Sequence, residues 1–212
     1  TAAEANPAGL AVILRPEISF ELKGLQFTKS ANNFSSTGTL ANFTVQERDF
    51  KSKLFSPSFA SFVYPFIDIA PDMVLTLAAF RHELVNFKSE FYTIGAFGPP
   101  SPAEGVYKPV RSSLSLKVVN WGGAIGVKIS KGVSIGASAG IAIADMNSTL
   151  SRYSVAVFDD DFLDNRASIN DSQNEFFVNA GILIKPTDNV AIGGVYKRRP
   201  RFHVKHTFVV PS

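Results

Sequence analysis

The chain has 212 residues, of which 45% are hydrophobic and only 18% are charged, and its formal net charge is +3. Soluble domains usually carry about 25% charged residues. This chain is therefore poor in charge, yet it has no uncharged stretch of the roughly 18 residues that a membrane helix needs. It contains no cysteine, which excludes a disulfide framework and thiol chemistry, and its mild basic excess does not indicate a nucleic-acid surface. Moderate hydrophobicity along the whole chain is typical of a transmembrane β-barrel, in which every second residue faces lipid.

The first 15 residues are small and apolar, and Asn6-Pro7 sets a turn among them. Residues 17–28 then predict a β-strand. Its apolar side chains change faces partway along, three on one face and then two on the other: Ile18, Phe20 and Leu22, followed by Leu25 and Phe27. Because side chains alternate strictly along a strand, this slip of one residue predicts a β-bulge at Lys23 and Gly24.

Further strands are expected near residues 39–46, 54–64 and 114–120, with another from 74 to 80 that can extend to 91. Residues 93–111 hold four prolines and three glycines and predict a long loop. Residues 145–172, which include Asp159-Asp160-Asp161, predict a second long loop. Long loops without structure of their own are uncommon and often functional.

The stretch Trp121–Ala144 allows two interpretations, a transmembrane helix with glycines four residues apart or two strands joined at Ser130-Lys131-Gly132. From Val133 onward, larger apolar residues alternate with small or polar ones in every second position, which a strand needs and a helix does not. Lys128 also opposes the helix, since a lysine at the centre of a membrane helix costs roughly 2.5–3.5 kcal/mol. The sequence therefore predicts a β-hairpin, whose apolar face meets either lipid or, in a soluble β-domain, a second sheet.

The C-terminal part predicts strands at residues 175–185, 190–196 and 202–210, with a tight turn at 186–189. The chain thus holds about eight strands, with short turns at 130–132 and 186–189 and long loops at 93–111 and 145–172. Short turns on one rim and long loops on the other are the layout of an outer-membrane barrel. We therefore expect an all-β fold, an antiparallel transmembrane β-barrel.

Three segments resemble one known family: Asn6–Ala11, Ser113–Ala144 and Val190–Phe202. They are similar to the end of the N-terminal plug, a mid-barrel strand–turn–strand and a later strand of the long-chain fatty-acid and aromatic-hydrocarbon transporters of Gram-negative outer membranes. The resemblance implies that residues 1–15 end a plug and that residues 16–212 form barrel strands. Because that family has about fourteen strands, this chain is expected to be part of a larger barrel or a smaller closed relative, since an open half would leave unpaired edges in lipid.

By this resemblance, Asn6, Pro7 and Ala8 gate passage from within the lumen, although they also fit a simple turn before the first strand. The aromatic segment 87–97 is interpreted as a loop that captures an acyl chain, with Lys88 available to a carboxylate. Its candidate binding residues are Phe87, Lys88, Phe91 and Phe97. The same aromatic residues also fit an interfacial girdle, which binds no specific ligand.

Three other clusters of charged residues and histidines also allow simple interpretations. The basic run Lys197, Arg198, Arg199 and Arg201 fits either a carboxylate or lipid-headgroup site or a solvated rim. His203 and His206 lie three apart and point to opposite faces of a strand, and the acidic loop lacks the spacing and glycine of an EF-hand. No metal site, cofactor or catalytic constellation is therefore expected, and the chain is not predicted to be an enzyme.

These observations together predict an outer-membrane channel for passive uptake of hydrophobic small molecules such as long-chain fatty acids. Its expected partners are such molecules and outer-membrane lipids, with no nucleic acid, and the protein is expected to be a monomer. In the family, substrate leaves laterally through the wall, and the bulge at Lys23 and Gly24 is the expected place. The alternatives are a barrel with a structural or secretion-assembly role and a soluble lipid-binding β-domain.

Overall fold

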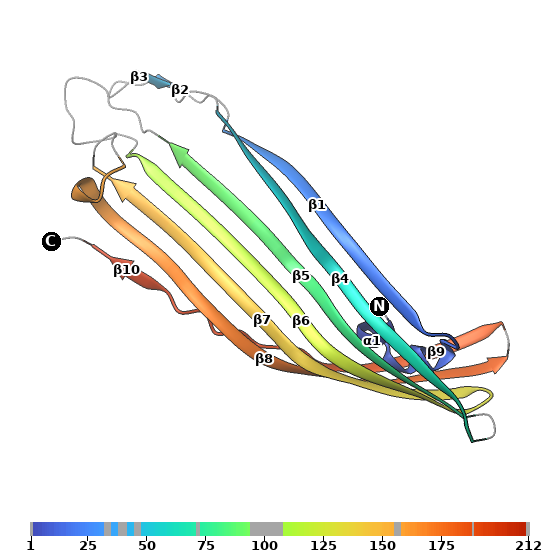
Figure 1. Ribbon diagram of the computed structural model, residues 1–212. Coiled ribbons are helices and arrows are strands. Elements are labelled where there is room, and N and C mark those ends of the chain that lie inside the picture. Colours follow the sequence, from blue (N-terminus) through green and yellow to red (C-terminus); the bar gives the residue numbers. More distant parts are fainter. Residues whose placement is uncertain are drawn as a thin grey trace.

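The computed structural model describes residues 2–31, 35–37, 42–44, 48–70, 73–93, 108–154, 158–187 and 189–210. Its main feature is one antiparallel sheet of eight strands, most of them long and tilted (Figure 1). The sheet contains β1 (Glu17–Ala31), β4 (Arg48–Ala70), β5 (Met73–Thr93), β6 (Val110–Ser130), β7 (Val133–Tyr153), β8 (Leu163–Thr187), β9 (Val190–Arg198) and β10 (Thr207–Val209). This confirms the all-β antiparallel fold.

The remaining elements are short. A helix α1 (Ala2–Ala5) and a 3-10 helix η1 (Pro7–Val12) precede the sheet. A small hairpin of β2 (Ser35–Thr37) and β3 (Asn42–Thr44) follows β1, and a 3-10 turn η2 (Asp160–Phe162) precedes β8. None of the described helices is long and apolar enough to cross a membrane.

The sheet is open within the described residues. Neighbouring strands follow the order β1-β4-β5-β6-β7-β8, and both β9 and β10 pair with β8. β9 pairs with the part of β8 from Val178 to Thr187, and β10 pairs near Ser168. No pairing among the described residues joins β1 to β8, β9 or β10, so the described strands do not close a barrel.

The two faces of the sheet differ in chemistry. The plug face, defined here as the face that contacts α1 and η1, carries small residues in its central rows. One such row is Ala78, Ala124, Ser138 and Asn179. The adjacent outer-face rows are apolar: Leu77, Ile125, Ala137 and Ala180, then Leu75, Val127, Ile135 and Ile182. The predicted β-hairpin at Trp121–Ala144 is confirmed, and its larger apolar residues lie on the outer face.

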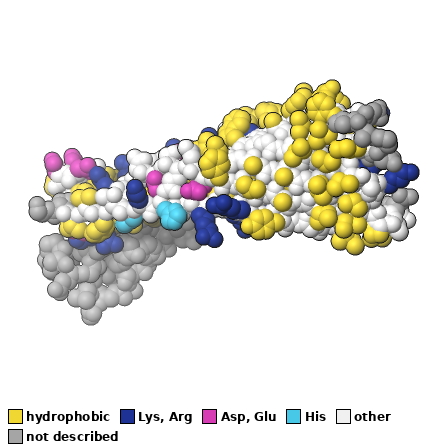
Figure 2. Space-filling model, turned by 90° about the horizontal axis from the view of Figure 1, so that it is seen from below, with side chains coloured by type: hydrophobic (Ala, Val, Ile, Leu, Met, Phe, Trp, Pro, Cys, Tyr) yellow, Lys and Arg dark blue, Asp and Glu magenta, His cyan; other side chains and the backbone are white. Residues whose placement is uncertain are grey.

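The outer face is apolar over only part of its length. On β6 the apolar outer residues run from Trp121 to Ile129, a stretch of roughly 27 Å at about 3.4 Å per residue. Beyond Trp121 the outer face turns polar, as in the cross-strand neighbours Lys117, Asp145 and Ser172. Figure 2 shows the same division, with hydrophobic side chains gathered over the half of the molecule that holds the short turns. We call this half the apolar belt.

The loop predicted at residues 145–172 is wrong over most of its length. β7 continues to Tyr153 and β8 begins at Leu163, and these extensions pair regularly, as Asn147 does with Asn170. These strand residues lie beyond the apolar belt, where the outer face is polar and the other face mixes polar residues with apolar ones such as Met146 and Ile169, so no sustained apolar alternation revealed them. Of the loop predicted at 93–111, Thr93, Val110 and Arg111 belong to strands, and residues 94–107 lie outside the described part.

The predicted bulge at Lys23 and Gly24 is also wrong, because these residues pair regularly with Ser56 and Phe55. The register instead shifts between Glu21 and Leu22, where Ser58 is the extra residue on β4. The apolar residues change faces for another reason. Ile18, Phe20 and Leu22 point outward in the apolar belt, whereas Phe27 lies beyond the belt and stacks on Phe87 with ring centroids 5.3 Å apart.

A second bulge lies at Leu84 in β5, where the ladder with β6 shifts between Glu83 and Val85. At the same level the backbone ladder between β4 and β5 stops, because its last pair is Phe59 with His82. From residue 48 to 58, β4 pairs with β1 only. We call the stretch between this part of β4 and β5 the wall gap.

Candidate functional site

The N-terminal segment of residues 2–12, called the plug segment, contacts the plug face, and Asn6 makes its main polar contacts. Asn6 caps η1, since its side-chain oxygen accepts a hydrogen bond from the Ala8 amide at 3.1 Å, and Pro7 occupies the first turn. The Asn6 side-chain amide also donates to the Ile182 carbonyl of β8 at 3.0 Å. One side chain therefore both starts the 3-10 helix and attaches it to the wall.

Three glycines form the seat of this segment. Gly126, Gly136 and Gly181 are direct cross-strand neighbours on β6, β7 and β8. A Cβ atom added to any of them would lie closer than 3.0 Å to the segment: to Leu10 and Ala11 at Gly126, to Pro7 and Ala8 at Gly136, and to Asn6 at Gly181. The segment therefore lies directly on the backbone of three strands, which only glycine permits.

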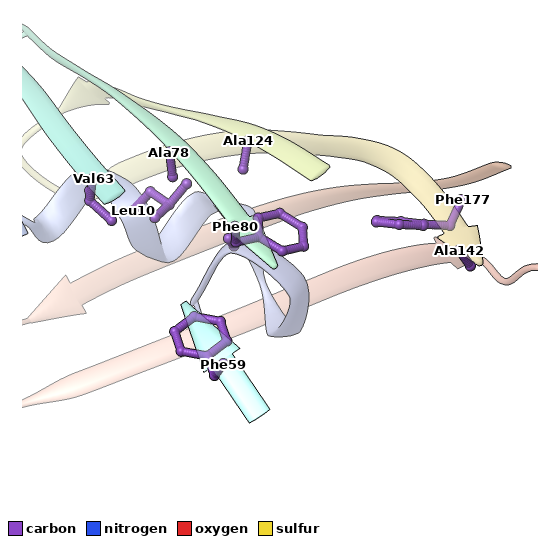
Figure 3. Close-up of a cluster of buried hydrophobic side chains, with 9 residues drawn as sticks. Leu10, Phe59, Val63, Ala78, Phe80, Ala124, Ala142 and Phe177 are labelled. Atoms are coloured by element: carbon purple, nitrogen blue, oxygen red, sulfur yellow. The ribbon is translucent and has the colours of Figure 1, made fainter. Parts of the chain in front are cut away.

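Apolar packing completes the seat. Ala8 is fully buried and Leu10 is 1% exposed. Leu10 belongs to a buried cluster with side chains from five strands, which Figure 3 shows: Phe59, Val63, Ala78, Phe80, Ala124, Ala142 and Phe177. Burial of one leucine side chain contributes about 1.5–3 kcal/mol. The segment is thus a packed part of the fold.

A polar contact fixes α1 to the same face. The Glu4 carboxylate contacts Nδ1 of His82 on β5 and accepts a hydrogen bond from the Asn120 side chain on β6 at 3.0 Å. The Phe59 ring meets the His82 ring edge-on, with centroids 5.8 Å apart. Glu4, in α1, therefore attaches the N-terminal segment to the sheet at a second point besides Asn6.

A cavity of about 530 Å³ lies beside this attachment. One side of it is apolar, with Leu84 and Phe177, and the basic end of β9 contributes Lys197, Arg198 and Arg199. Glu4 and His82 line it as well. The structure thus brings part of the predicted basic cluster to the plug segment, where an apolar wall and several cations suit an amphipathic anion.

The predicted binding residues lie elsewhere and are arranged differently. Phe87, Lys88 and Phe91 belong to strand β5, so the interpretation of this segment as a loop is wrong, and Phe97 lies outside the described residues. Strand alternation places Lys88 on the face opposite to Phe87 and Phe91. Lys88 is exposed and pairs with Glu90 at 3.5 Å.

Phe87 and Phe91 instead pack against aromatic side chains of β1 and β4 beside the wall gap, and of the predicted residues Lys88 lines a cavity there. Phe87 stacks on Phe27, the ammonium group of Lys29 lies 5.6 Å from the Phe87 ring centre, and Phe91 packs on Phe50 at 5.4 Å. A cavity of about 700 Å³ opens here between β4 and β5. The sequence did not predict it, since nothing in the strand pattern shows where a ladder stops.

No family model, curated protein or solved structure matches the chain. Among the described residues, no three acidic or histidine side chains gather to hold a metal ion.

The glycine seat can be tested with Gly136→Val. The added side chain collides with Pro7 and Ala8, so we expect the plug segment to detach and the free energy of unfolding to fall by about 1–3 kcal/mol. Gly123→Val is the matched control, because a Cβ there meets only the Ala78 carbonyl at an ordinary 3.6 Å. Equal protease sensitivity of residues 2–12 in both variants would contradict the seat.

The Glu4 attachment can be tested with Glu4→Ala. A hydrogen bond to a charged group contributes about 1.5–3 kcal/mol, so amides of the plug segment such as Gly9 and Ile13, which bond within η1, should exchange roughly tenfold faster or more. Glu90→Ala, which removes an exposed carboxylate, is the control. Unchanged exchange in Glu4→Ala would show that this contact does not hold α1.

Proposed function

We propose that this chain forms wall and plug of an outer-membrane β-barrel through which hydrophobic small molecules such as long-chain fatty acids pass without chemistry. One observation carries the proposal. The same strands that seat the plug segment on Gly126, Gly136 and Gly181 expose apolar side chains on their opposite face, such as Ile125, which is 39% exposed. None of the described elements covers that face, and lipid is the solvent that suits it.

The sheet edges support a larger, closed assembly. In lipid every backbone N–H and C=O must be paired, which only helices and closed barrels achieve. The described edges at β1 and β9 have no partner on their free side. Further strands between these two edges would complete the wall around the plug.

The height of the apolar belt agrees with a membrane position. Outer-membrane barrels carry an apolar band about 25 Å tall, bordered by aromatic residues. Trp121 stands at the upper border of the belt, 53% exposed, and the Arg81 guanidinium lies 5.8 Å from its ring centre. An aromatic ring with a neighbouring cation suits the interface between lipid and water.

A path for the substrate follows from the cavities. An amphipathic molecule would enter among the aromatic side chains of the wall gap and reach the cavity beside the plug, where its head would meet the basic end of β9. The wall gap suits entry because the backbone ladder between β4 and β5 is interrupted there, whereas Lys23 and Gly24 offer no lateral exit, because they pair regularly with β4.

A barrel with a structural role is the second candidate, and the close packing of the plug favours it. The buried cluster around Leu10 fills the space between the plug segment and the sheet, so the segment must move before a substrate can pass. Uptake distinguishes the two functions. Expression in a channel-deficient strain should restore uptake of a long-chain fatty acid above the empty-vector control. A folded, membrane-inserted protein that neither binds the fatty acid nor restores uptake would contradict the transport function.

The membrane position can be tested separately with Ile125→Arg. An arginine on the lipid face costs about 2–4 kcal/mol near the midplane of the bilayer and little beyond it. The control is Ser115→Arg, five rows away on the same face of β6 and beyond the apolar belt. Unfolding measured in lipid bilayers should show a large loss only for Ile125→Arg. Equal losses would contradict a lipid-facing belt.

A further inference from the structure

A charged cluster surrounds a buried carboxylate in the wall, one residue after His82, which contacts Glu4. The Glu83 side chain of β5 is completely buried and accepts a hydrogen bond from the Ser56 hydroxyl of β4 at 2.6 Å. Lys23 of β1 lies 3.3 Å from one carboxylate oxygen, and Arg81 of β5 lies 3.6 Å from the other. Three strands thus meet at one carboxylate.

Packing alone does not explain this cluster. Burying a carboxylate is costly, and well-packed apolar residues of similar volume often stabilise a fold as well or better. The cluster therefore calls for a role beyond filling space.

Its place in the sheet indicates that role. The backbone ladder between β4 and β5 ends at Phe59 and His82, and Glu83 is the next residue. From there, side chains replace backbone pairing, since Ser56 donates to Glu83 and Arg81 donates to the Pro57 carbonyl. The bulges at Ser58 and Leu84 lie at the same level.

Farther along the wall gap, no buried carboxylate joins the strands among the described residues. The contacts there include the Ser52 hydroxyl donating to the Lys88 carbonyl at 3.0 Å, a contact between Lys29 and Ser89, and the ring pairs Phe27–Phe87 and Phe50–Phe91. The charged cluster is thus the buried ionic connection between β4 and β5 next to the end of the ladder.

We propose that the cluster of Lys23, Ser56, Arg81 and Glu83 fixes the lower end of the wall gap. By holding β1 and β4 against β5, it stops the separation of β4 from β5 from extending farther toward the apolar belt. Loss of the Glu83 carboxylate leaves the partly exposed cations Lys23 and Arg81 without the anion between them, and their repulsion moves β1 and the paired strand β4 away from β5. The inference concerns the width of the gap. Only its consequence for passage rests on the proposed function.

Because the chain has no cysteine, two spin labels can be placed without background. Lys53→Cys on β4 and Lys88→Cys on β5 are exposed positions on either side of the gap. In the membrane-inserted protein, Glu83→Ala should increase the distance between the labels by about 5 Å, one strand spacing. Asp145→Ala, an exposed carboxylate on β7 that accepts from Ser172, should leave it unchanged.

Ser56→Ala, which removes one hydrogen bond and no charge, keeps the test decisive if Glu83→Ala fails to fold. It should widen the distribution of distances across the gap, whereas labels at Lys117→Cys and Asn147→Cys on the paired strands β6 and β7 should not move. An unchanged gap distance in a folded Glu83→Ala or Ser56→Ala variant would overturn the inference. A wider gap with unaltered fatty-acid uptake would uphold it and count against substrate passage through the gap.

Discussion

The approach of the N-terminal segment to the backbone of Gly126, Gly136 and Gly181 is the contact on which the rest of the structure depends. It defines which face of the sheet is the interior, and it accounts for the small residues along that face. It also brings Leu10 to the centre of the buried cluster and Glu4 to His82 and Asn120. Larger residues in place of these three glycines would collide with the N-terminal segment and displace it from the sheet.

Much of the fold could be predicted from the sequence where one face is apolar. The alternation after Val133 correctly gave the central hairpin and its outward side, because a two-residue period with large and small partners admits one arrangement. The prediction failed beyond the apolar belt. There Asn147 and Asn170 pair in a regular ladder although the outer face is polar and the other face is mixed, so composition alone resembles a loop.

The site was harder to predict than the fold. Asn6 and Pro7 stand out in the sequence because their turn chemistry is local, and the structure places them against the wall. The glycine row is visible only once the register of three strands is known. Glu83 gives no signal at all, since its partners lie on β1 and β4 and its burial follows from where a ladder ends. A resemblance carried by three short segments could not supply these pairings.

If the proposed membrane position is correct, the outer face of the sheet meets lipid while the opposite face seats the plug. Spin labels at consecutive positions from 134 to 143 of β7, placed one at a time in the membrane-inserted protein, distinguish the two faces. We expect a two-residue period, with labels at Ile135, Ala137, Ala139 and Ile141 accessible to oxygen in lipid and those between them shielded. Equal access of a water-soluble relaxation agent at both sets of positions would contradict it.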